Sequence, residues 1–508
     1  MRITNQMLTS NMMLNINRNK QNMSTKGDQY ATGQKIQRPS EDPIVAVRSL
    51  KFATNLSELN QYYEKNIPDA KSWMDITESA LDNINAMLTQ IHTYCDQGAS
   101  DTLTVSDRDA IAETLKEYKD QIYQLGNSDY AGRYVFTGYR TDTSFIFEEA
   151  CHDFQYEIKE PLTTDQLQQI SYISGGASYE EGKSASDYLN ESATKQSAYR
   201  IRLAYDNLDE TDEITIYYKT EDMTEEDDPL EMTFPKMSSA EANVYQTEDE
   251  GHFIPETGEI VLSEEQYEIL SKVTQMHAEY SKSSFGARDV RPEHYFECTT
   301  YEIEKEEDGT YVRKEDEEGN PITRYYSNPE TQDIEYEVNF SQSLKINTLA
   351  KDSITTVIGR EIDEIINTIS QVQNKETQLQ RIKTKIDDTT TEEEERKNLE
   401  QLYTQVSDEL TLWQNVLQEK FSVGLTTSSN VQQQVNVAVS DLGARYNRLE
   451  LTEDRLSSQQ VDFTEMINDN DNVDMEEAII NYSSAQTTYN ASLNAASKCV
   501  QNTLLDFL

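Results

Sequence analysis

The chain has 508 residues, of which 93 are acidic and 44 basic, so its formal net charge is −49. This length allows about three domains of about 150 residues each, and the mean hydropathy of −0.76 argues against one large globular core. The negative charge disfavours nucleic acid as a partner, because phosphates require clustered Lys and Arg, and without any run of about 18 apolar residues we expect no membrane insertion.

Residues 1–42 form the first predicted region, a helix with little stability of its own. Residues 1–26 contain four basic residues and no acidic residue. Leu8, Met12 and Ile16 mark an apolar face, but asparagines, which are poor helix formers, crowd the rest. Ordering this segment costs about 1–2 kcal/mol per residue in backbone entropy. We therefore expect disorder in the monomer and order on assembly, with ordinary frayed ends as the alternative. The opening residues also lack the apolar core of a cleaved secretion signal.

Residues 43–150 are predicted to form a helical rod region with a β-hairpin at about 132–147. Asp42 is the expected N-cap of its first helix, with Pro43 in the first turn. Apolar residues at strict 4-3 spacing predict a long helix that is buried along one seam. The seam residues are Ile67, Ala70, Met74, Thr77, Leu81, Ile84, Leu88 and Ile91.

Two further features of this region lead to specific expectations. Pro68 lies inside the seam helix and predicts a kink or a break near Ile67, because proline removes a hydrogen bond and clashes with the preceding turn. A second helix, antiparallel to the first, is expected after Ser106 as N-cap, with Asp109 three residues later. Its apolar stripe comprises Ile111, Leu115, Tyr118, Ile122 and Leu125.

Residues 151–345 differ in composition, with 17 of the 30 tyrosines and with 46 acidic against 16 basic residues. Alternating apolar residues predict strands at 214–218, 230–234 and 334–338. Turns are expected at Asp308-Gly309, Gly319-Asn320 and Thr257-Gly258, and a short helix is expected from Ser263 to His277. The acidic runs at 225–228 and 304–308 are typical of solvated edges and loops. We interpret this region as an acidic, tyrosine-rich β insert.

The C-terminal half returns to helical spacing, with a rod region at 346–468 and a last helix at 469–508. Thr391 and Glu394 predict a capping box, and Asp474 predicts the N-cap of the last helix, with Glu477 three residues later. The last helix, like the first, is expected to be disordered in the monomer. The four apolar stripes are Ile358, Ile362, Ile365, Ile369, Val372 and Leu379; Leu399, Tyr403, Val406, Leu410, Trp413 and Leu417; Val435, Val439, Leu442, Tyr446, Leu449, Leu456 and Phe463; and Ile479, Tyr482, Tyr489, Leu493, Ala496 and Val500.

No motif in the chain predicts catalysis, a cofactor or a metal site. The four cysteines and five histidines are scattered. Residues 469–477 resemble a calcium loop, but Val473 occupies a ligand position and Asp474 the glycine position, so a helix cap is the better interpretation. Tyrosine-rich faces are also typical of carbohydrate binding, although packing is the commoner reason. We expect no enzyme activity.

Four segments carry a family pattern. The first is ATGQKIQRPSEDP at 31–43, with Gly33, Pro39, Ser40, Asp42 and Pro43. The second is GRYVFTGYRT at 132–141, with Gly132, Arg133, Tyr134, Phe136 and Gly138. The third is DLGAR at 441–445, with Gly443 and Arg445, and the fourth is the opening MRIT together with the ending LLDFL. Together they resemble the flagellar hook-associated protein 3 family of hook–filament junction proteins, which are related to flagellin. The resemblance covers roughly residues 1–147 and 430–508.

The resemblance implies a mostly α, flagellin-like fold with an inserted β-rich domain. In this fold paired N- and C-terminal segments make long antiparallel coiled-coil helices, with an axial helix and a spoke-like segment in 1–42 and a second axial helix in 469–508, and the insert points outward. It also implies a structural protein of the extracellular bacterial flagellum, a self-associating junction ring between hook and filament that leaves the cell unfolded through the flagellar type III apparatus. The implied partners are further copies of the chain, the neighbouring hook-associated protein on the hook side, flagellin on the filament side, and a cytoplasmic export chaperone on the C-terminal helix.

The expected assembly interface lies on the two terminal helices. Its candidate residues are Ile3, Leu8, Met12, Ile16, Tyr482, Tyr489, Leu493, Val500 and Leu504. Two other interpretations stay open: a variant flagellin that builds the filament, and a secreted adhesin or glycan-binding protein that acts through 151–345.

Overall fold

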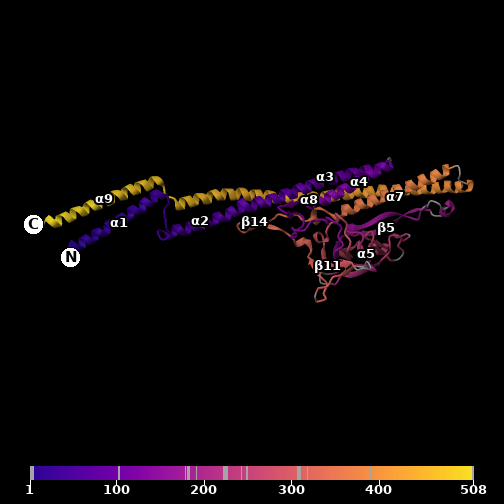
Figure 1. The fold of residues 1–508 in the computed structure, drawn as a ribbon, viewed down its shortest axis with the longest axis horizontal. Coiled ribbons are helices and arrows are strands. Elements are labelled where there is room, and N and C mark those ends of the chain that lie inside the picture. The colour runs from indigo at the N-terminus through magenta and orange to yellow at the C-terminus, as the bar shows by residue number, and fades with distance from the viewer. Residues whose placement is uncertain are drawn as a thin grey trace. The chain divides into compact units, whose positions relative to one another are not determined.

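The computed structural model describes residues 5–100, 103–177, 179, 184–189, 192–220, 223, 227–241, 243–247, 250–305, 311–316, 318–388 and 392–505. The chain divides into two compact units (Figure 1). Unit 1 comprises Met1–Ala70, Tyr336–Leu344 and Asn447–Leu508, and unit 2 comprises Lys71–Glu335 and Lys345–Tyr446. Long helices at both ends of the chain and a β-rich middle confirm the predicted fold class.

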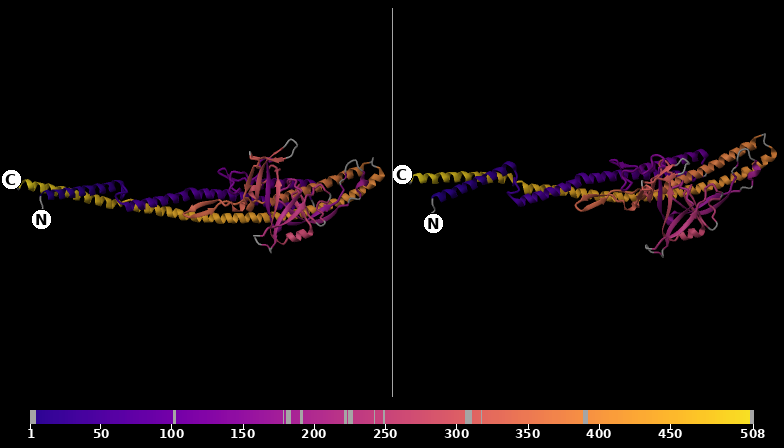
Figure 2. Two further views of the ribbon diagram at one scale, coloured as in Figure 1. Left: turned by 90° about the horizontal axis from the view of Figure 1, so that it is seen from below. Right: turned by 60° about the horizontal axis from the view of Figure 1, so that its bottom comes forward.

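Unit 1 is built from two pairs of helices. Helix α1 (Asn5–Thr32) lies side by side with α9 (Met475–Leu505), and the two chain termini are at the same end of this pair, which is therefore antiparallel (Figures 1 and 2). Helix α2 (Pro43–Gln61) pairs with the C-terminal part of α8 (Glu393–Asp471), where the amide of Gln460 donates to Asn60 at 2.8 Å. The hairpin of β14 (Glu335–Asn339) and β15 (Gln342–Lys345) adjoins this pair, because the amide of Asn66 donates to the carbonyl oxygen of Glu337.

The helix that contains Pro68 is not broken. A π-helical turn, η1 (Tyr62–Asn66), joins α2 to α3 (Ile67–Gly98), and the backbone N–H of Ile67 donates to the carbonyl oxygen of Tyr62. One wide turn just before the proline relieves the clash between its ring and the preceding carbonyl group without ending the helix. The alternative of a break near Ile67 is therefore wrong.

The helices of unit 2 form an antiparallel bundle of α3, α4 (Val105–Leu125), α7 (Thr356–Asp387) and α8. Asn85 of α3 bonds Asn436 of α8 at 2.8 Å, and Arg108 of α4 pairs with Glu376 of α7 at 2.9 Å. The seam that begins at Ile67 is confirmed, since each of its eight residues is at most 1% exposed. The second and third apolar stripes of the C-terminal half lie on one helix, α8, which has 79 residues.

The cap of α4 is two residues earlier than predicted. Thr104, not Ser106, is the N-cap: its hydroxyl accepts from the backbone N–H of Asp107, whose carboxylate accepts from the N–H of Thr104 at 3.0 Å. These bonds to Thr104 lower the pKa of Asp107. The predicted capping box of Thr391 lies outside the described residues, because Thr391 itself is not described, and α8 begins at Glu393.

The β-rich part of unit 2 contains two larger antiparallel sheets. A seven-stranded sheet has the order β12-β11-β3-β10-β6-β7, with β13 also paired to β11, and a four-stranded sheet has the order β4-β5-β9-β8. The elements are β3 (Phe154–Leu162), β4 (Leu167–Ser174), β5 (Thr194–Arg202), β6 (Glu213–Thr220), β7 (Leu230–Pro235), β8 (His252–Ile254), β9 (Glu259–Leu262), α5 (Glu264–Leu270), β10 (Val273–Lys282), β11 (Glu297–Lys305), β12 (Tyr311–Arg313), β13 (Thr323–Tyr326) and α6 (Ala350–Ser353).

The three predicted strands are confirmed as β6, β7 and β14. The helix predicted from Ser263 to His277 is wrong beyond Leu270: Ser263 is the N-cap of α5, but residues 273–282 form β10, because they pair on both sides with β6 and β3. Gly258 and Gly319 turn with positive φ angles of 64° and 82°. The predicted turn at 308–309 and most of the two acidic runs lie outside the described residues.

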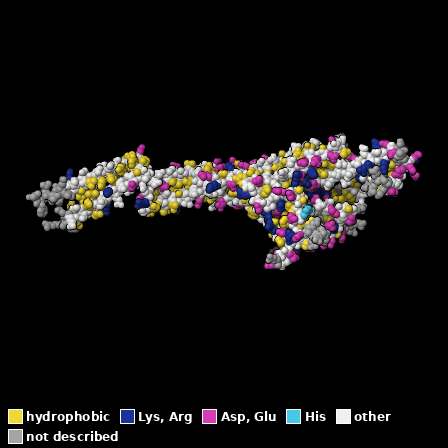
Figure 3. Space-filling model, viewed as in Figure 1, with side chains coloured by type: hydrophobic (Ala, Val, Ile, Leu, Met, Phe, Trp, Pro, Cys, Tyr) yellow, Lys and Arg dark blue, Asp and Glu magenta, His cyan; other side chains and the backbone are white. Residues whose placement is uncertain are grey.

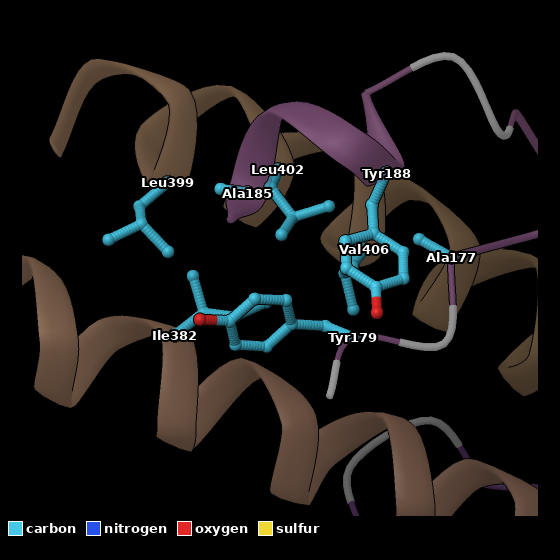
Figure 4. Packing of buried hydrophobic residues seen from close by; sticks show 8 residues of the cluster. All are labelled: Ala177, Tyr179, Ala185, Tyr188, Ile382, Leu399, Leu402 and Val406. Carbon is cyan, nitrogen blue, oxygen red and sulfur yellow. The ribbon is translucent and has the colours of Figure 1, made fainter. Parts of the chain in front are cut away.

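A segment between β4 and β5 packs the β-rich part onto the ends of α7 and α8. Figure 4 shows Tyr179 and Tyr188 among Ile382 of α7 and Leu402 and Val406 of α8. The same segment is held by polar contacts: the Lys375 ammonium donates to the carbonyl oxygen of Ala177 at 2.9 Å and pairs with Glu409 at 2.6 Å. The segment thus covers an apolar patch that the helical hairpin alone would expose to water.

A buried ionic network joins the four-stranded sheet to α7 and α8. Glu364 of α7 binds Arg200 at 2.6 Å and Lys420 at 2.5 Å, and it also pairs with Arg202. Arg202 in turn pairs with Glu361 at 2.7 Å. Burial alone would raise the pKa of Glu364, but Arg200, Lys420 and Arg202 hold it well below the usual range. Glu364 is therefore ionised and is the common anion of three cations.

Glu160 of β3 makes the stability of unit 2 depend on pH. Its buried carboxyl group accepts from the Tyr280 hydroxyl at 2.6 Å and from the backbone N–H of Ala204 at 3.0 Å, and burial raises its pKa from 4.5 to about 7. As pH rises, the carboxyl group of Glu160 loses its proton at a lower pH in the unfolded chain than in the folded chain. The contribution of Glu160 to the free energy of unfolding therefore falls as pH rises from about 4.5 to about 7. We expect Glu160→Gln to remove that slope in urea titrations across this range. Glu157→Gln on the same strand should keep it, and identical slopes for wild type and Glu160→Gln would contradict the assignment.

Candidate assembly interface

The pair of terminal helices has a narrow inner contact. Tyr30 of α1 stacks on Tyr482 of α9, with ring centroids 6.1 Å apart and an interplanar angle of 11°. Gly27 lies against the same ring, so a Cβ atom there would come within 3.2 Å of it. Among the described side chains of α9, the buried ones are the small Ala478 and Ala485, which let the two backbones approach. Met12, Ile16, Tyr482 and Tyr489 of the predicted interface are half-buried in the single chain.

The outer faces of both terminal helices are apolar and exposed to solvent. On α1, Met7 and Leu14 are 59% and 57% exposed, and Met13 and the predicted Leu8 are exposed as well. On α9, Ile479, Ile480 and the predicted Leu493 are exposed. Figure 3 shows hydrophobic side chains gathered over these two helices. Ile3 lies outside the described residues; Val500 and Leu504 belong to α9, but their side chains are not described.

Sequence analysis missed Met7, Met13 and Leu14. The sequence does contain a sign of them: α1 carries apolar residues on more than one side, which is typical of a helix that contacts more than one neighbour. The prediction considered only the spacing of Leu8, Met12 and Ile16, which describes a single face.

A backbone clasp joins the end of α1 to the start of α9; we define it as residues 33–35 and 471–473. Gly33 has a φ angle of 73°, which ends α1 in the left-handed region. The N–H of Lys35 donates to the carbonyl oxygen of Asp471 at 2.7 Å, and the N–H of Val473 donates to that of Gly33 at 2.8 Å. The clasp thus lies between the two helix pairs of unit 1 and holds the two chain ends together through main-chain bonds.

The remaining residues of the first family segment begin α2. Asp42 is its N-cap and accepts from the N–H of Ile44 at 3.0 Å, and Pro43 is its first residue. Pro39 and Ser40 are exposed. Asp474 caps α9 in the same way, accepting from Glu476 at 2.8 Å. Both caps agree with the sequence prediction.

The outer faces of the second helix pair are apolar too. The exposed side chains are Ile44, Val47 and Leu50 of α2 and Leu451, Val461 and Met466 of α8. Unit 1 therefore leaves apolar side chains uncovered along both of its helix pairs.

The second family segment lies in unit 2, and its hairpin is shorter than predicted. Strands β1 (Asp129–Tyr130) and β2 (Arg133–Tyr134) are joined by Ala131 and Gly132, with φ angles of 52° and 77°. Two residues with positive φ make a tight hairpin turn. The two paired strands cover only residues 129–134, so the predicted span of about 132–147 is wrong. The Arg133 guanidinium lies over the Trp73 ring at 5.1 Å. The rest of the segment packs irregularly.

Phe136 anchors this irregular part because it is fully buried, and its carbonyl oxygen accepts from the N–H of Ala350. Gly138 has a φ angle of 61° and leaves no space for a Cβ atom beside Gln332. In the third segment, Arg445 donates to the carbonyl oxygen of Asn347 at 2.8 Å, whereas a Cβ atom at Gly443 would meet nothing within 4 Å. The second and third segments thus belong to unit 2, whereas the terminal helices belong to unit 1.

Comparison with known families accounts for both ends of the chain. The bacterial flagellin N-terminal helical region matches residues 3–141, and the bacterial flagellin C-terminal helical region matches residues 426–508. Both ends of the chain are therefore similar to bacterial flagellin over these residues.

The flagellin-like chain is also similar to named flagellar proteins. It is 28% identical over 150 residues to flagellar hook-associated protein 3 of Escherichia coli K12, across 29% of this chain and 47% of the relative. It is 29% identical over 145 residues to the Salmonella typhimurium protein of the same name, across 28% and 45%. A flagellin of Clostridium tyrobutyricum is 28% identical over 126 residues, across 25% and 33%. These matches confirm the predicted resemblance, and the chain spans about half the length of the hook-associated relatives it matches.

Solved structures of flagellar proteins also align with the chain, but with low structural similarity and low sequence identity. FlgL of Xanthomonas campestris aligns with a TM-score of 0.30 and 10% identity, over 82% of this chain and 98% of that one. Hook-associated protein 3 of Legionella pneumophila aligns with a TM-score of 0.28 and 12% identity, over 82% and 97%. Because both TM-scores lie below 0.5, the resemblance to flagellar proteins depends on the sequence matches alone.

The described part of the flagellin-like chain offers neither a membrane-spanning helix nor a clustered metal site. No helix there is both long and apolar enough to cross a membrane, and no group of three or more His, Cys, Asp or Glu side chains is arranged to hold a metal ion.

Proposed function

We propose that this protein is a structural component of the bacterial flagellum that joins hook to filament by self-association. One observation carries the proposal: the two flagellin regions bring the chain ends together as an antiparallel helix pair with uncovered apolar outer faces. Large exposed apolar surfaces are rare on soluble monomers and mark sites of association. Further copies of the chain would cover these faces and build a ring.

The proposal extends to order, partners and location. Residues 1–42 and 469–508 become fully ordered only on assembly, because little of their apolar surface is covered within one chain. The axial partners are a neighbouring hook-associated protein on the hook side and flagellin on the filament side. The chain leaves the cell unfolded through the flagellar type III apparatus, with an export chaperone on α9, and functions outside the cell without turnover. Limited proteolysis of the dilute monomer should remove both ends first; equal resistance of ends and middle would contradict this.

Immunogold electron microscopy tests the junction against a variant flagellin. A junction protein gives a single band of label between hook and filament, because only a short collar is built from it. Label along the whole filament would replace the proposal by the variant flagellin. Label on neither structure would overturn both.

Leu493→Asp tests the outer face of α9. Leu493 is 40% exposed in the single chain, so the substitution leaves the monomer folded, whereas burying a carboxylate in an apolar contact between copies weakens association by several kcal/mol. Sedimentation velocity measures this change. Asn490→Asp adds the same charge at an exposed polar position and is the matched control. Equal association of the two variants would mean that this face does not lie between copies.

A further inference from the structure

The second helix pair of unit 1 has two outer faces that the chain itself does not cover. Its inner contact is antiparallel, because the Ser49 hydroxyl of α2 donates to Asp471 of α8 at 2.7 Å and the Gln460 amide donates to Asn60 at 2.8 Å. Since the two helices pack through their inner faces, their outer faces lie on opposite sides of the pair.

The outer face of α2 combines apolar and basic side chains, and we call it the basic stripe. Its members are all exposed, and each lies three or four residues from another member: Ile44, Val47, Arg48, Leu50 and Lys51. The three apolar members are between 53% and 69% exposed. Neither Arg48 nor Lys51 has an ion-pair partner among the described residues. The one acidic residue of this helix, Glu58, lies two turns beyond Lys51.

The outer face of α8 is its counterpart, and we call it the acidic stripe. Its members are exposed at the same spacing: Leu451, Asp454, Ser458, Val461, Asp462, Glu465 and Asp469. None of its four carboxylates forms an ion pair within the described part of the chain. The nearby Arg455 donates to Gln342 of β15 at 3.2 Å. Residues 447–471 contain seven acidic and two basic side chains, so the acidic excess remains when every arginine is counted.

Exposed stripes of this kind are typical of helices that pack against another helix. Apolar side chains repeated three and four residues apart form the seam, and the charges beside the seam select the partner and its orientation. The two stripes of one chain cannot meet, because they lie on opposite sides of the pair. Copies of a chain with a net charge of −49 repel one another overall, so contact between them is favoured where a basic surface meets an acidic one.

We propose that the basic stripe of one copy packs against the acidic stripe of the next copy. This inference rests on the proposed self-association and names the faces through which it occurs. The contact is head-to-tail, because each copy carries one stripe on either side of its helix pair. Such a contact continues from copy to copy and closes into a ring when the rotation between copies allows it.

The positions of the carboxylates limit the register of this contact. Within one chain Ser49 lies beside Asp471, so Lys51 is level with Asp469 on the antiparallel helix. A rotation about an axis along the helices keeps this level from one copy to the next. Shifts of four or seven residues, which preserve the seam, bring Glu465 or Asp462 level with Lys51 instead. Each of these registers therefore places a carboxylate opposite Lys51.

Mixing two charge-reversed variants of the full-length chain tests the contact by sedimentation velocity. Arg48→Glu/Lys51→Glu makes the basic stripe acidic. Asp462→Lys/Glu465→Lys/Asp469→Lys makes the acidic stripe basic. Each variant alone should associate about 5–50-fold more weakly than the wild type, because every contact then joins like charges. An equimolar mixture should regain association, since alternating copies of the two variants place opposite charges at every contact.

Lys116→Glu/Lys383→Glu is the matched control, because it makes the same charge change as Arg48→Glu/Lys51→Glu at exposed helical positions of unit 2. It should associate as the wild type does, and circular dichroism shows that each variant folds. If the wild type associates but the mixture of variants does not, or if the control is weakened equally, the inference is overturned while the proposed self-association stands. If the wild type itself does not associate, both are overturned.

Discussion

Replacing Glu364 by glutamine should lower the free energy of unfolding of unit 2 by about 3–5 kcal/mol, because a buried cation loses its counter-charge. Among the described residues Lys420 would keep no ion-pair partner, whereas Arg200 and Arg202 would each keep one, Glu259 and Glu361. Arg200, Arg202 and Lys420 all pair with this carboxylate, and the three basic side chains are at most 10% exposed. Glutamine keeps the shape of the side chain and some of its hydrogen bonds but not its charge. The loss therefore measures charge compensation rather than packing, and urea unfolding followed by circular dichroism reports it.

Glu268→Gln is the matched control for this change. Glu268 and Lys272 form an ion pair in which the side chains are 69% and 76% exposed, so its loss should change the free energy of unfolding by less than about 1 kcal/mol. The effect at Glu364 also has a definite pH dependence. Since the folded state lowers the pKa of Glu364, the advantage of the wild type over Glu364→Gln is present at neutral pH and is lost as pH falls well below 4.5. An advantage that persists in strong acid would contradict the role of charge.

Phe421→Ala should cost about 3–5 kcal/mol of unfolding free energy, the usual result of emptying a large buried aromatic site. Phe421 of α8 is fully buried, and its ring lies against Gly98 at the end of α3, where a Cβ atom would come within 2.4 Å of the ring. The backbone of α3 is thus as close to the ring as glycine allows. Because the surrounding helices pack on several sides, the cavity cannot close by a small shift. Urea unfolding monitors the change.

Val423→Ala, two residues along the same helix, is the control for Phe421. Val423 is 43% exposed, and its truncation should change the free energy by less than about 0.5 kcal/mol. Similar losses for both variants would show that helix propensity, rather than packing between α3 and α8, determines the effect. A loss below about 1 kcal/mol for Phe421→Ala would mean that neighbouring side chains move in to fill the space left by the ring.

Much of the helical architecture was predictable from the sequence because burial imposes a regular spacing. The 4-3 pattern from Ile67 to Ile91 predicted a seam that is fully buried, and the alternating patterns of β6, β7 and β14 predicted strands. The caps at Asp42 and Asp474 followed from side chains that can accept from the first free N–H groups of a helix. Each of these features depends on residues close together in the chain.

The features that were missed depend on residues far apart or on the choice between equivalent local signals. Thr104 and Ser106 are each followed by Asp three residues later, so the sequence alone did not favour the correct cap of α4. Glu364 could not be singled out among the 93 acidic residues, because its pairing with basic side chains of β5 and α8 arises only in the folded chain. The second apolar face of α1 was not predicted, because the spacing of Leu8, Met12 and Ile16 on one face was sufficient to predict a helix.

The clasp at residues 33–35 and 471–473 has a consequence for mutational tolerance. Its two hydrogen bonds join main-chain groups, which every amino acid except proline supplies equally at the donor positions. Gln34 and Asn472 can therefore be replaced by many other residues without loss of the two hydrogen bonds that join the ends of the chain. Gly33 has no such freedom, because its left-handed backbone penalises almost any side chain. Of the residues in the clasp, Gly33 is therefore the one whose substitution should disturb it most.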